Sequence, residues 1–115
     1  MTPANTTQLL KDSQLIVDVF DNSVARQAVK NYAEQLSIPC LHAGLSVDYA
    51  EVIWNEVYRV PSEVNNDVCD YPLARNLVML TVAVACEAIA AFVATAEQRN
   101  FTITLKDLTI QSLFL

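Results

Sequence analysis

The stretch LIVDVFDNSVAR, residues 15–26, constrains the fold of this chain more than any other segment. It begins with a short apolar run rich in β-branched residues, which is typical of a strand buried on both faces. Asp18, Asp21 and Asn22 follow where such a strand would end. Across residues 24–36 the apolar side chains recur at steps of three and four, which predicts one stripe of a helix. The segment therefore predicts a strand, a carboxylate-bearing turn and a helix. In open α/β sheets, ligands bind at the carboxyl ends of strands, where Asp21 would lie.

The rest of the chain alternates strand and helix patterns. The helix after the turn stops at Pro39, because the residue before a proline avoids the α region. The residues 101–110 alternate threonine with apolar side chains, which predicts a strand with a break near Lys106 and Asp107. The expected strands are 14–20, 40–46, 49–55 and 101–110, with 57–60 as an extension or a further short strand, and the expected helices are 23–36 and 73–98. Residues 1–12 are expected to be a flexible lead-in that can hold a helical turn, and 13–115 one α/β domain.

Charge and cysteine content exclude several classes of protein. The formal net charge is −6 and there is no basic run, which disfavours binding to nucleic acid phosphates. Three cysteines without a C-x-x-C pair predict neither a disulfide framework nor a zinc site. Because the first residues are polar, we expect no signal peptide. These features are typical of a protein in the reducing cytoplasm.

Glycine occurs once, at Gly44. Nucleotide-binding α/β domains need a Gly-rich turn, because the backbone must approach the phosphates at a helix N-terminus. We therefore expect that this chain does not bind ATP alone in that manner.

The residues Asp18-Val19-Phe20-Asp21-Asn22, followed after three residues by Arg26, resemble the D-x-x-D-N-x-x-x-R motif of the ThiF/MoeB/E1-like adenylyltransferases. The order of the predicted elements across residues 13–112 is also similar. The resemblance implies a partial Rossmann-like E1/ThiF fold, with a mixed β-sheet and flanking helices, that lacks the N-terminal Gly-rich nucleotide-binding half. It also implies ATP-dependent activation of the C-terminus of a ubiquitin-like or sulfur-carrier protein.

The resemblance has consequences for cofactors and partners. It implies ATP and Mg²⁺, used only together with a complementing nucleotide-binding half on missing or separate sequence. This chain would then be the product of a truncated or split gene, and a separate Gly-rich partner chain would supply the missing half. A homo-oligomer such as a dimer is also expected. A non-catalytic interaction or dimerisation module derived from the same fold is the alternative.

The resemblance places Asp21 at Mg²⁺, and Asp21, Asn22 and Arg26 at the nucleotide. The residues themselves allow simpler roles. Asp21 can interact with the positive end of the following helix, Asn22 can cap that helix, and Arg26 can pair with an acid across the turn. Asp18 is expected to be structural, as a carboxylate that caps the turn.

The three cysteines and the single histidine are further candidates for reactive side chains. Cys69 precedes the long helix, whose dipole would favour a thiolate nucleophile, but an ordinary loop thiol is the simpler interpretation. Cys40 and Cys86 lie in apolar runs and are expected in the core. His42, the only histidine, is a possible general base, although a hydrogen bond inside the core is more typical.

Two further features have alternative interpretations. The aromatic residues Tyr49, Trp54 and Tyr58 are expected in the core rather than on a partner-binding face. Residues 77–96 hold a single charge, Glu87, so a membrane span must be considered. A glutamate at the centre of a span is costly in lipid. We therefore expect a helix buried in a layered domain and no contact with a membrane.

Overall fold

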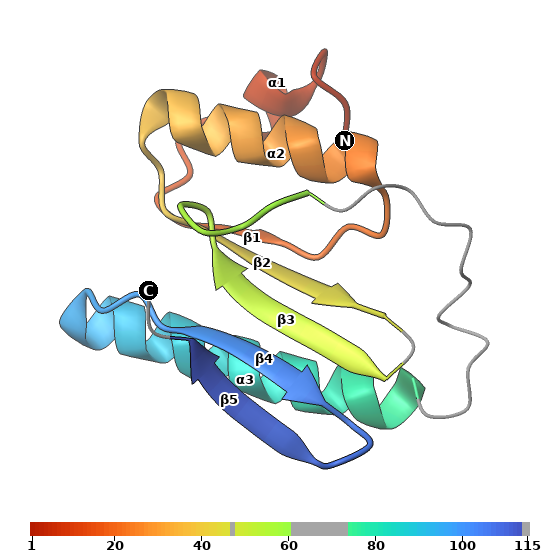
Figure 1. The fold of residues 1–115 in the computed structure, drawn as a ribbon. Coiled ribbons are helices and arrows are strands. Elements are labelled where there is room, and N and C mark those ends of the chain that lie inside the picture. The colour runs from red at the N-terminus through yellow and green to blue at the C-terminus, as the bar shows by residue number, and fades with distance from the viewer. Residues whose placement is uncertain (47, 61–73, 114–115) are drawn as a thin grey trace.

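The computed structural model describes residues 1–46, 48–60 and 74–113. Helices and strands follow one another along the chain as in Figure 1. Their bounds are α1 Thr6–Leu10, β1 Ile16–Asp18, α2 Ser23–Leu36, β2 Cys40–Leu45, β3 Tyr49–Trp54, α3 Ala74–Thr95, β4 Asn100–Thr104 and β5 Thr109–Leu113.

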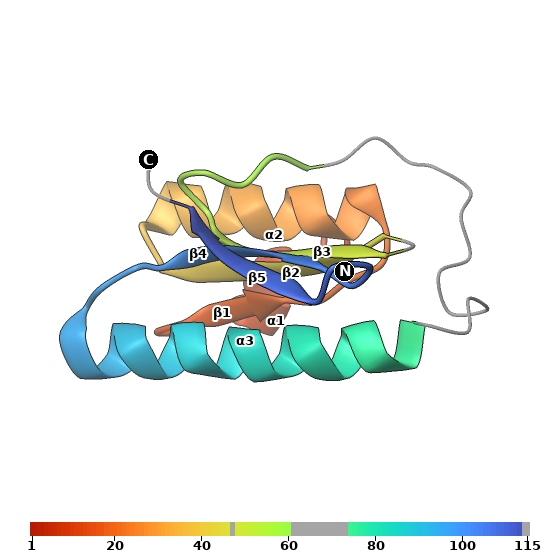
Figure 2. The ribbon, with the colours of Figure 1, turned by 60° about the horizontal axis from the view of Figure 1, so that its bottom comes forward.

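The strands of the described residues form one mixed sheet in the order β1-β2-β3-β4-β5. β1 and β2 are parallel, whereas the other neighbouring pairs are antiparallel. Figure 2 shows α2 on one side of the sheet and α3 on the other. The α/β class with a mixed sheet and flanking helices is therefore as the sequence predicts, and the architecture is consistent with a Rossmann-like fold.

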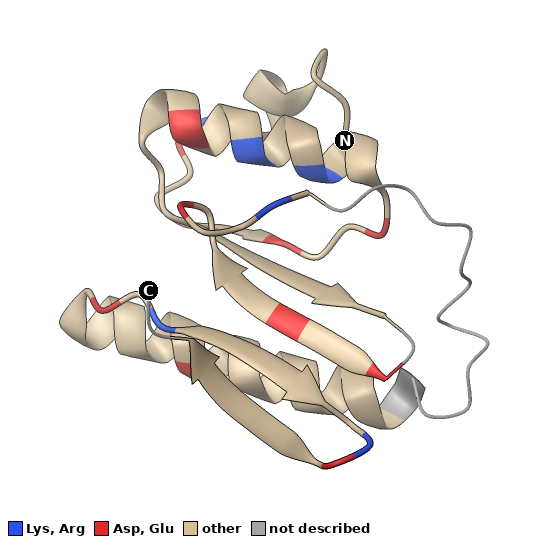
Figure 3. Cartoon of the chain, viewed as in Figure 1, with Lys and Arg blue, Asp and Glu red and all other residues tan. Residues whose placement is uncertain are grey.

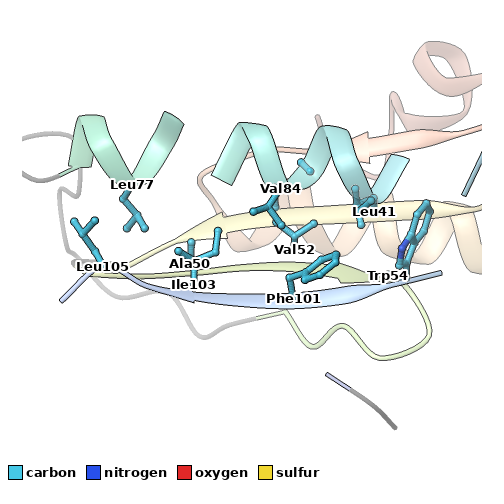
Figure 4. Close-up of a cluster of buried hydrophobic side chains, with 12 residues drawn as sticks. Leu41, Ala50, Val52, Trp54, Leu77, Val84, Phe101, Ile103 and Leu105 are labelled. Atoms are coloured by element: carbon cyan, nitrogen blue, oxygen red, sulfur yellow. The ribbon is translucent and has the colours of Figure 1, made fainter. Parts of the chain in front are cut away.

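The larger core lies between α3 and the sheet (Figure 4). Alternate residues of β2, β3 and β4 point toward α3, as the two-residue period of a strand requires. On the helix, positions three or four apart meet them. The buried members are Leu41, Ala43, Ala50, Val52, Trp54, Leu77, Val84, Ala85, Ala88, Phe101, Ile103 and Leu105.

A smaller cluster lies on the α2 side of β1 and β2. Ile16 and Cys40 pack there against the inward stripe of α2. Met1 and Leu10 are partly buried against the same cluster, so α1 and the residues before it lie against α2. The segment expected to be a lead-in thus contains the first helix.

Several element bounds follow from local chemistry. The predicted helix 23–36 is confirmed. β1 is shorter than the predicted 14–20, because Asp18 Oδ1 accepts from the Phe20 backbone N–H (3.0 Å) and turns the chain. The break predicted near Lys106 and Asp107 is confirmed, since a turn there separates β4 from β5.

The strand predicted at 57–60 is wrong. The Val57 and Tyr58 amides both donate to the Trp54 carbonyl oxygen (3.1 and 3.0 Å), which makes a turn directly after β3. This turn folds Tyr58 back onto the sheet, where its side chain is buried.

Among the described residues, only the inner face of α3 is covered. The segment Asn76–Thr95 has the length and mean hydropathy (2.4) of a membrane span, and 28% of it is buried within the fold. Leu77 and Ala88 face the sheet, whereas Met79 and Val93 are more than 70% exposed. The helix is therefore a covering layer of the domain with an apolar outer side, rather than a fully buried element.

Candidate functional site

The turn between β1 and α2 carries Asp21 and Asn22, and both are exposed. Asn22 Oδ1 accepts from the Ala25 backbone N–H at 2.8 Å, so the predicted helix cap is confirmed. Asp21 makes a long contact of 3.5 Å with the Asn22 side-chain amide. Its carboxylate thus faces solvent at the N-terminus of α2, where the helix dipole favours negative charge.

Asp18 ends β1 and is 1% exposed. Its Oδ1 accepts from the Phe20 amide at 3.0 Å. Its Oδ2 faces Arg26 Nη1 at 3.2 Å and His42 Nδ1 at 2.6 Å. The predicted turn-capping role of Asp18 is therefore confirmed, and the same carboxylate also joins two basic side chains inside the fold.

Arg26 points from α2 into the fold rather than toward solvent, with its side chain 8% exposed. Besides Asp18, it donates from Nη1 to the Tyr58 hydroxyl (3.2 Å) and from Nη2 to the Ala43 carbonyl oxygen (2.8 Å). The ion pair across the turn is thus confirmed for Arg26. Its guanidinium is engaged by three different elements of the chain.

His42 completes what we call the buried polar network, made of Asp18, Arg26, His42, Asn55 and Tyr58. The His42 ring lies between Asp18 Oδ2 and Asn55 Oδ1, each 2.6 Å from one ring nitrogen. It also stacks on the Tyr58 ring, with centroids 3.8 Å apart and an interplanar angle of 6°. The expected core hydrogen bond of His42 is confirmed, and the side chain is fully buried.

Two groups near this network have a shifted pKa, and burial is the main cause of both shifts. Burial raises the pKa of Tyr58, and the Arg26 guanidinium acts in the opposite direction. Burial also raises the pKa of Glu51, while the charges of Arg26 and His42 lower it. Figure 3 shows acidic and basic residues on α2, on β3 and near the end of β1, whereas most of α3 carries no charge. Electrostatic interactions therefore concentrate on the α2 side of the sheet.

A metal ion would find few ligands in the described part of the chain. No group of three or more His, Cys, Asp or Glu side chains there is arranged to hold one. Mg²⁺ commonly binds through one or two carboxylates together with substrate phosphates and water. The exposed Asp21 carboxylate fits that arrangement as a single ligand, and the remaining ligands would have to come from a nucleotide and from water.

The cysteines differ from the expectation in one case. Cys40 is buried, as predicted, and burial raises its pKa to about 12, with the Asp18 charge acting in the same direction. Cys86 is exposed, so its expected place in the core is wrong. It lies on the side of α3 away from the sheet, and the helix is so rich in apolar residues that its sequence gives little indication of which side is the inner one. Cys69 lies outside the described residues.

The expected burial of the aromatic residues is correct for Trp54 and Tyr58 and wrong for Tyr49. Trp54 and Tyr58 are buried at 1% and 2% exposure, as expected for the core, whereas Tyr49 is 39% exposed at the start of β3. The sequence did not predict the contacts that Tyr58 and Asn55 make in the buried polar network. Neither residue forms a recognisable sequence pattern with Asp18, because the chain brings them together only through the sheet.

This chain resembles known proteins in its fold. Neither a protein-family model nor a curated protein sequence matches it. Solved structures do match. A structure of PaaA aligns with a TM-score of 0.62 at 17% identity, covering 96% of this chain and 38% of that chain. The chain has a ThiF-like fold.

Two structures of E. coli MccB agree with that match. The complex of MccB with MccA-N7isoASN aligns with a TM-score of 0.61, and MccB alone with 0.56, both at 12% identity. They cover 93% of this chain and 39% and 38% of theirs. The chain thus spans well under half the length of the proteins it matches, and at these identities the likeness concerns the fold.

Proposed function

We propose that this chain is part of an ATP-dependent adenylyltransferase that activates the C-terminus of a ubiquitin-like or sulfur-carrier protein. The observation that carries the proposal is the position of Asp21. Its carboxylate is exposed at the carboxyl end of β1 and at the N-terminus of α2, in a ThiF-like fold. This edge of an α/β sheet is where ligands bind.

The residues present indicate which parts of the reaction this chain would supply and which would come from a second chain. Asp21 would hold Mg²⁺, which neutralises developing charge on the phosphates when it is bound. In adenylation, a carrier carboxylate attacks the α-phosphorus of ATP, and pyrophosphate leaves. Because Gly44 is the only glycine in the chain, the loop that cradles the phosphates would come from a complementing Gly-rich half.

The resemblance assigns nucleotide contacts to Asn22 and Arg26 as well. In the structure, Asn22 caps α2 and Arg26 is directed into the fold. We infer that these two residues support the Asp21 turn. A nucleophilic role for Cys69 stays a prediction, as does a location in the cytoplasm.

The test is ATP–pyrophosphate exchange with this chain alone and with a Gly-rich α/β chain encoded beside it, each in the presence of a sulfur-carrier protein. We expect exchange only in the mixture. Asp21→Asn removes the charge at nearly constant shape and should abolish exchange, whereas Asp107→Asn in the β4–β5 turn is the matched control and should have no effect. Absence of exchange in the mixture of folded wild-type proteins would refute the proposal.

A non-catalytic interaction or dimerisation module is the second candidate. The observation that favours it is the apolar outer side of α3, where Val78, Met79, Val82 and Val93 are exposed. Exposed apolar patches of this kind mark interaction sites. An apolar helix surface would also suit a membrane protein. Analytical ultracentrifugation without detergent distinguishes the two, because an interaction module would form a defined oligomer, whereas a membrane protein would not stay in solution.

A further inference from the structure

His42 is fully buried and so cannot touch a nucleotide or a carrier protein directly. It lies on β2, under the ring of Tyr58, with both ring nitrogens 2.6 Å from an oxygen atom. Any contribution that His42 makes to a site at the surface must therefore pass through one of its neighbours.

One of these neighbours leads to the turn that carries Asp21. His42 Nδ1 faces Oδ2 of Asp18, and the other oxygen of the same carboxylate accepts from the Phe20 amide at 3.0 Å. Phe20 directly precedes Asp21 in the chain. The orientation of the Asp18 carboxylate thus determines where the backbone before Asp21 lies.

The other neighbour holds the histidine ring in place. The Asn55 side-chain nitrogen is directed to the Lys30 carbonyl oxygen (3.4 Å), so its Oδ1 faces His42 Nε2. The Asp18 oxygen that faces Nδ1 is an acceptor, so Nδ1 is the donor in this contact, while Cys40 Sγ lies 3.6 Å from Nε2. The ring is further fixed by its stack on Tyr58.

We propose that His42 is a positioning residue that acts through Asp18 to hold the turn carrying Asp21. The inference rests on the proposed function for its catalytic consequence, but the hydrogen-bond relay from His42 to Phe20 is a property of this chain alone. Arg26 Nη1 contacts the same oxygen of Asp18, Oδ2, at 3.2 Å, so this oxygen faces two donors.

Two substitutions at His42 separate positioning from packing. In His42→Asn the side-chain NH₂ takes the place of Nδ1 and keeps the hydrogen bond to Asp18. In His42→Gln it takes the place of Nε2 and keeps only the contact with Asn55. Both variants lose the ring that stacks on Tyr58, so they are matched in lost packing.

The first readout is hydrogen exchange of the Phe20 amide measured by NMR. We expect the wild type and His42→Asn to protect this amide, and His42→Gln to exchange at least about tenfold faster at similar resistance to urea, because a freed amide exchanges by local opening. Equal protection of the Phe20 amide in the two variants would overturn the proposal.

A measurement on the wild type covers the case in which the variants do not fold. Because His42 is the only histidine, its ring nitrogens give the only imidazole signals in a long-range ¹H–¹⁵N spectrum. We expect a slowly exchanging, hydrogen-bonded proton on Nδ1. An Nδ1 without a proton would overturn the proposal.

The second readout is pyrophosphate exchange with the complementing Gly-rich chain. We expect His42→Gln to lose about tenfold or more in rate relative to His42→Asn, since small displacements of a catalytic group are costly. If Phe20 responds as expected and no mixture shows exchange, the adenylyltransferase proposal fails while the relay stands. If exchange occurs at equal rates in both variants, the positioning role fails alone.

Discussion

The guanidinium of Arg26 lies so close to the backbone of Gly44 that a β-carbon at residue 44 would be 3.2 Å from Nη2. The same nitrogen donates to the carbonyl oxygen of Ala43 at 2.8 Å. Gly44, the only glycine of the chain, therefore lies on strand β2 and leaves room for the buried side chain of Arg26 from α2. It does not belong to a phosphate-binding loop. Arg26 reaches Asp18 and Tyr58 because β2 leaves this space open.

We expect Gly44→Ala to destabilise the fold by about 1–3 kcal/mol, the usual cost of adding a carbon to a packed interior. Without Arg26 above it, alanine in place of a strand glycine would instead be favourable. Urea unfolding measures the difference. Ser46→Ala, just after the end of β2, is the control and should change stability by less than about 0.5 kcal/mol. A Gly44→Ala variant as stable as the wild type would contradict this packing.

Glu51 predicts a pH dependence of stability. Burial raises its pKa from the ordinary value of 4.5, although Arg26 and His42 oppose the shift. The folded state therefore holds the proton more tightly than the unfolded state. Its contribution to stability is present below the unfolded pKa and is lost as the pH rises through the folded pKa.

We accordingly expect Glu51→Gln to be more stable than the wild type at pH 7 and to match it near pH 4. Urea unfolding at the two pH values measures this, and Glu97→Gln, which is exposed beyond α3, is the matched control. A variant less stable than the wild type at pH 7 would show that the attraction of Glu51 to Arg26 outweighs its burial.

The two described cysteines should differ in reactivity. Burial raises the pKa of Cys40 to about 12, so its thiol is both inaccessible and protonated, whereas Cys86 is exposed. In a Cys69→Ser background, we expect iodoacetamide at pH 8 to add one group to the folded protein, at Cys86, and a second only in denaturant. Mass spectrometry distinguishes the two products. Two adducts on the folded chain would place Cys40 at the surface.

Elements governed by neighbours in the chain could be predicted from the sequence. The helix after Asn22 has its cap three residues from the amide that it binds, and its apolar stripe is visible in the spacing. The break between β4 and β5 was visible in the polar residues Lys106 and Asp107. The motif around Asp21 was also local, and so was the pairing of Arg26 with an acid of the same turn.

The network behind the turn could not be predicted in this way. Asp18 and His42 are 24 residues apart, and Arg26 and Tyr58 are 32 apart. Their contacts arise from the parallel pairing of β1 with β2 and from the turn after β3, neither of which leaves a periodic signal. The expected place of Cys86 was wrong for a related reason, since apolar residues occur all round α3 and its sequence gives little indication of which side faces the sheet.

The sequence by itself thus determined the α/β class, the strand–turn–helix unit and the residues at its turn, because short-range hydrogen bonding and apolar periodicity act within a few residues. The tertiary structure alone decided that Asp18 is shared by Arg26 and His42, that Gly44 serves a buried guanidinium, and that one side of α3 is exposed. The physical reason is that burial and strand pairing join residues distant in the chain, and a buried charge is tolerated only where such partners meet it.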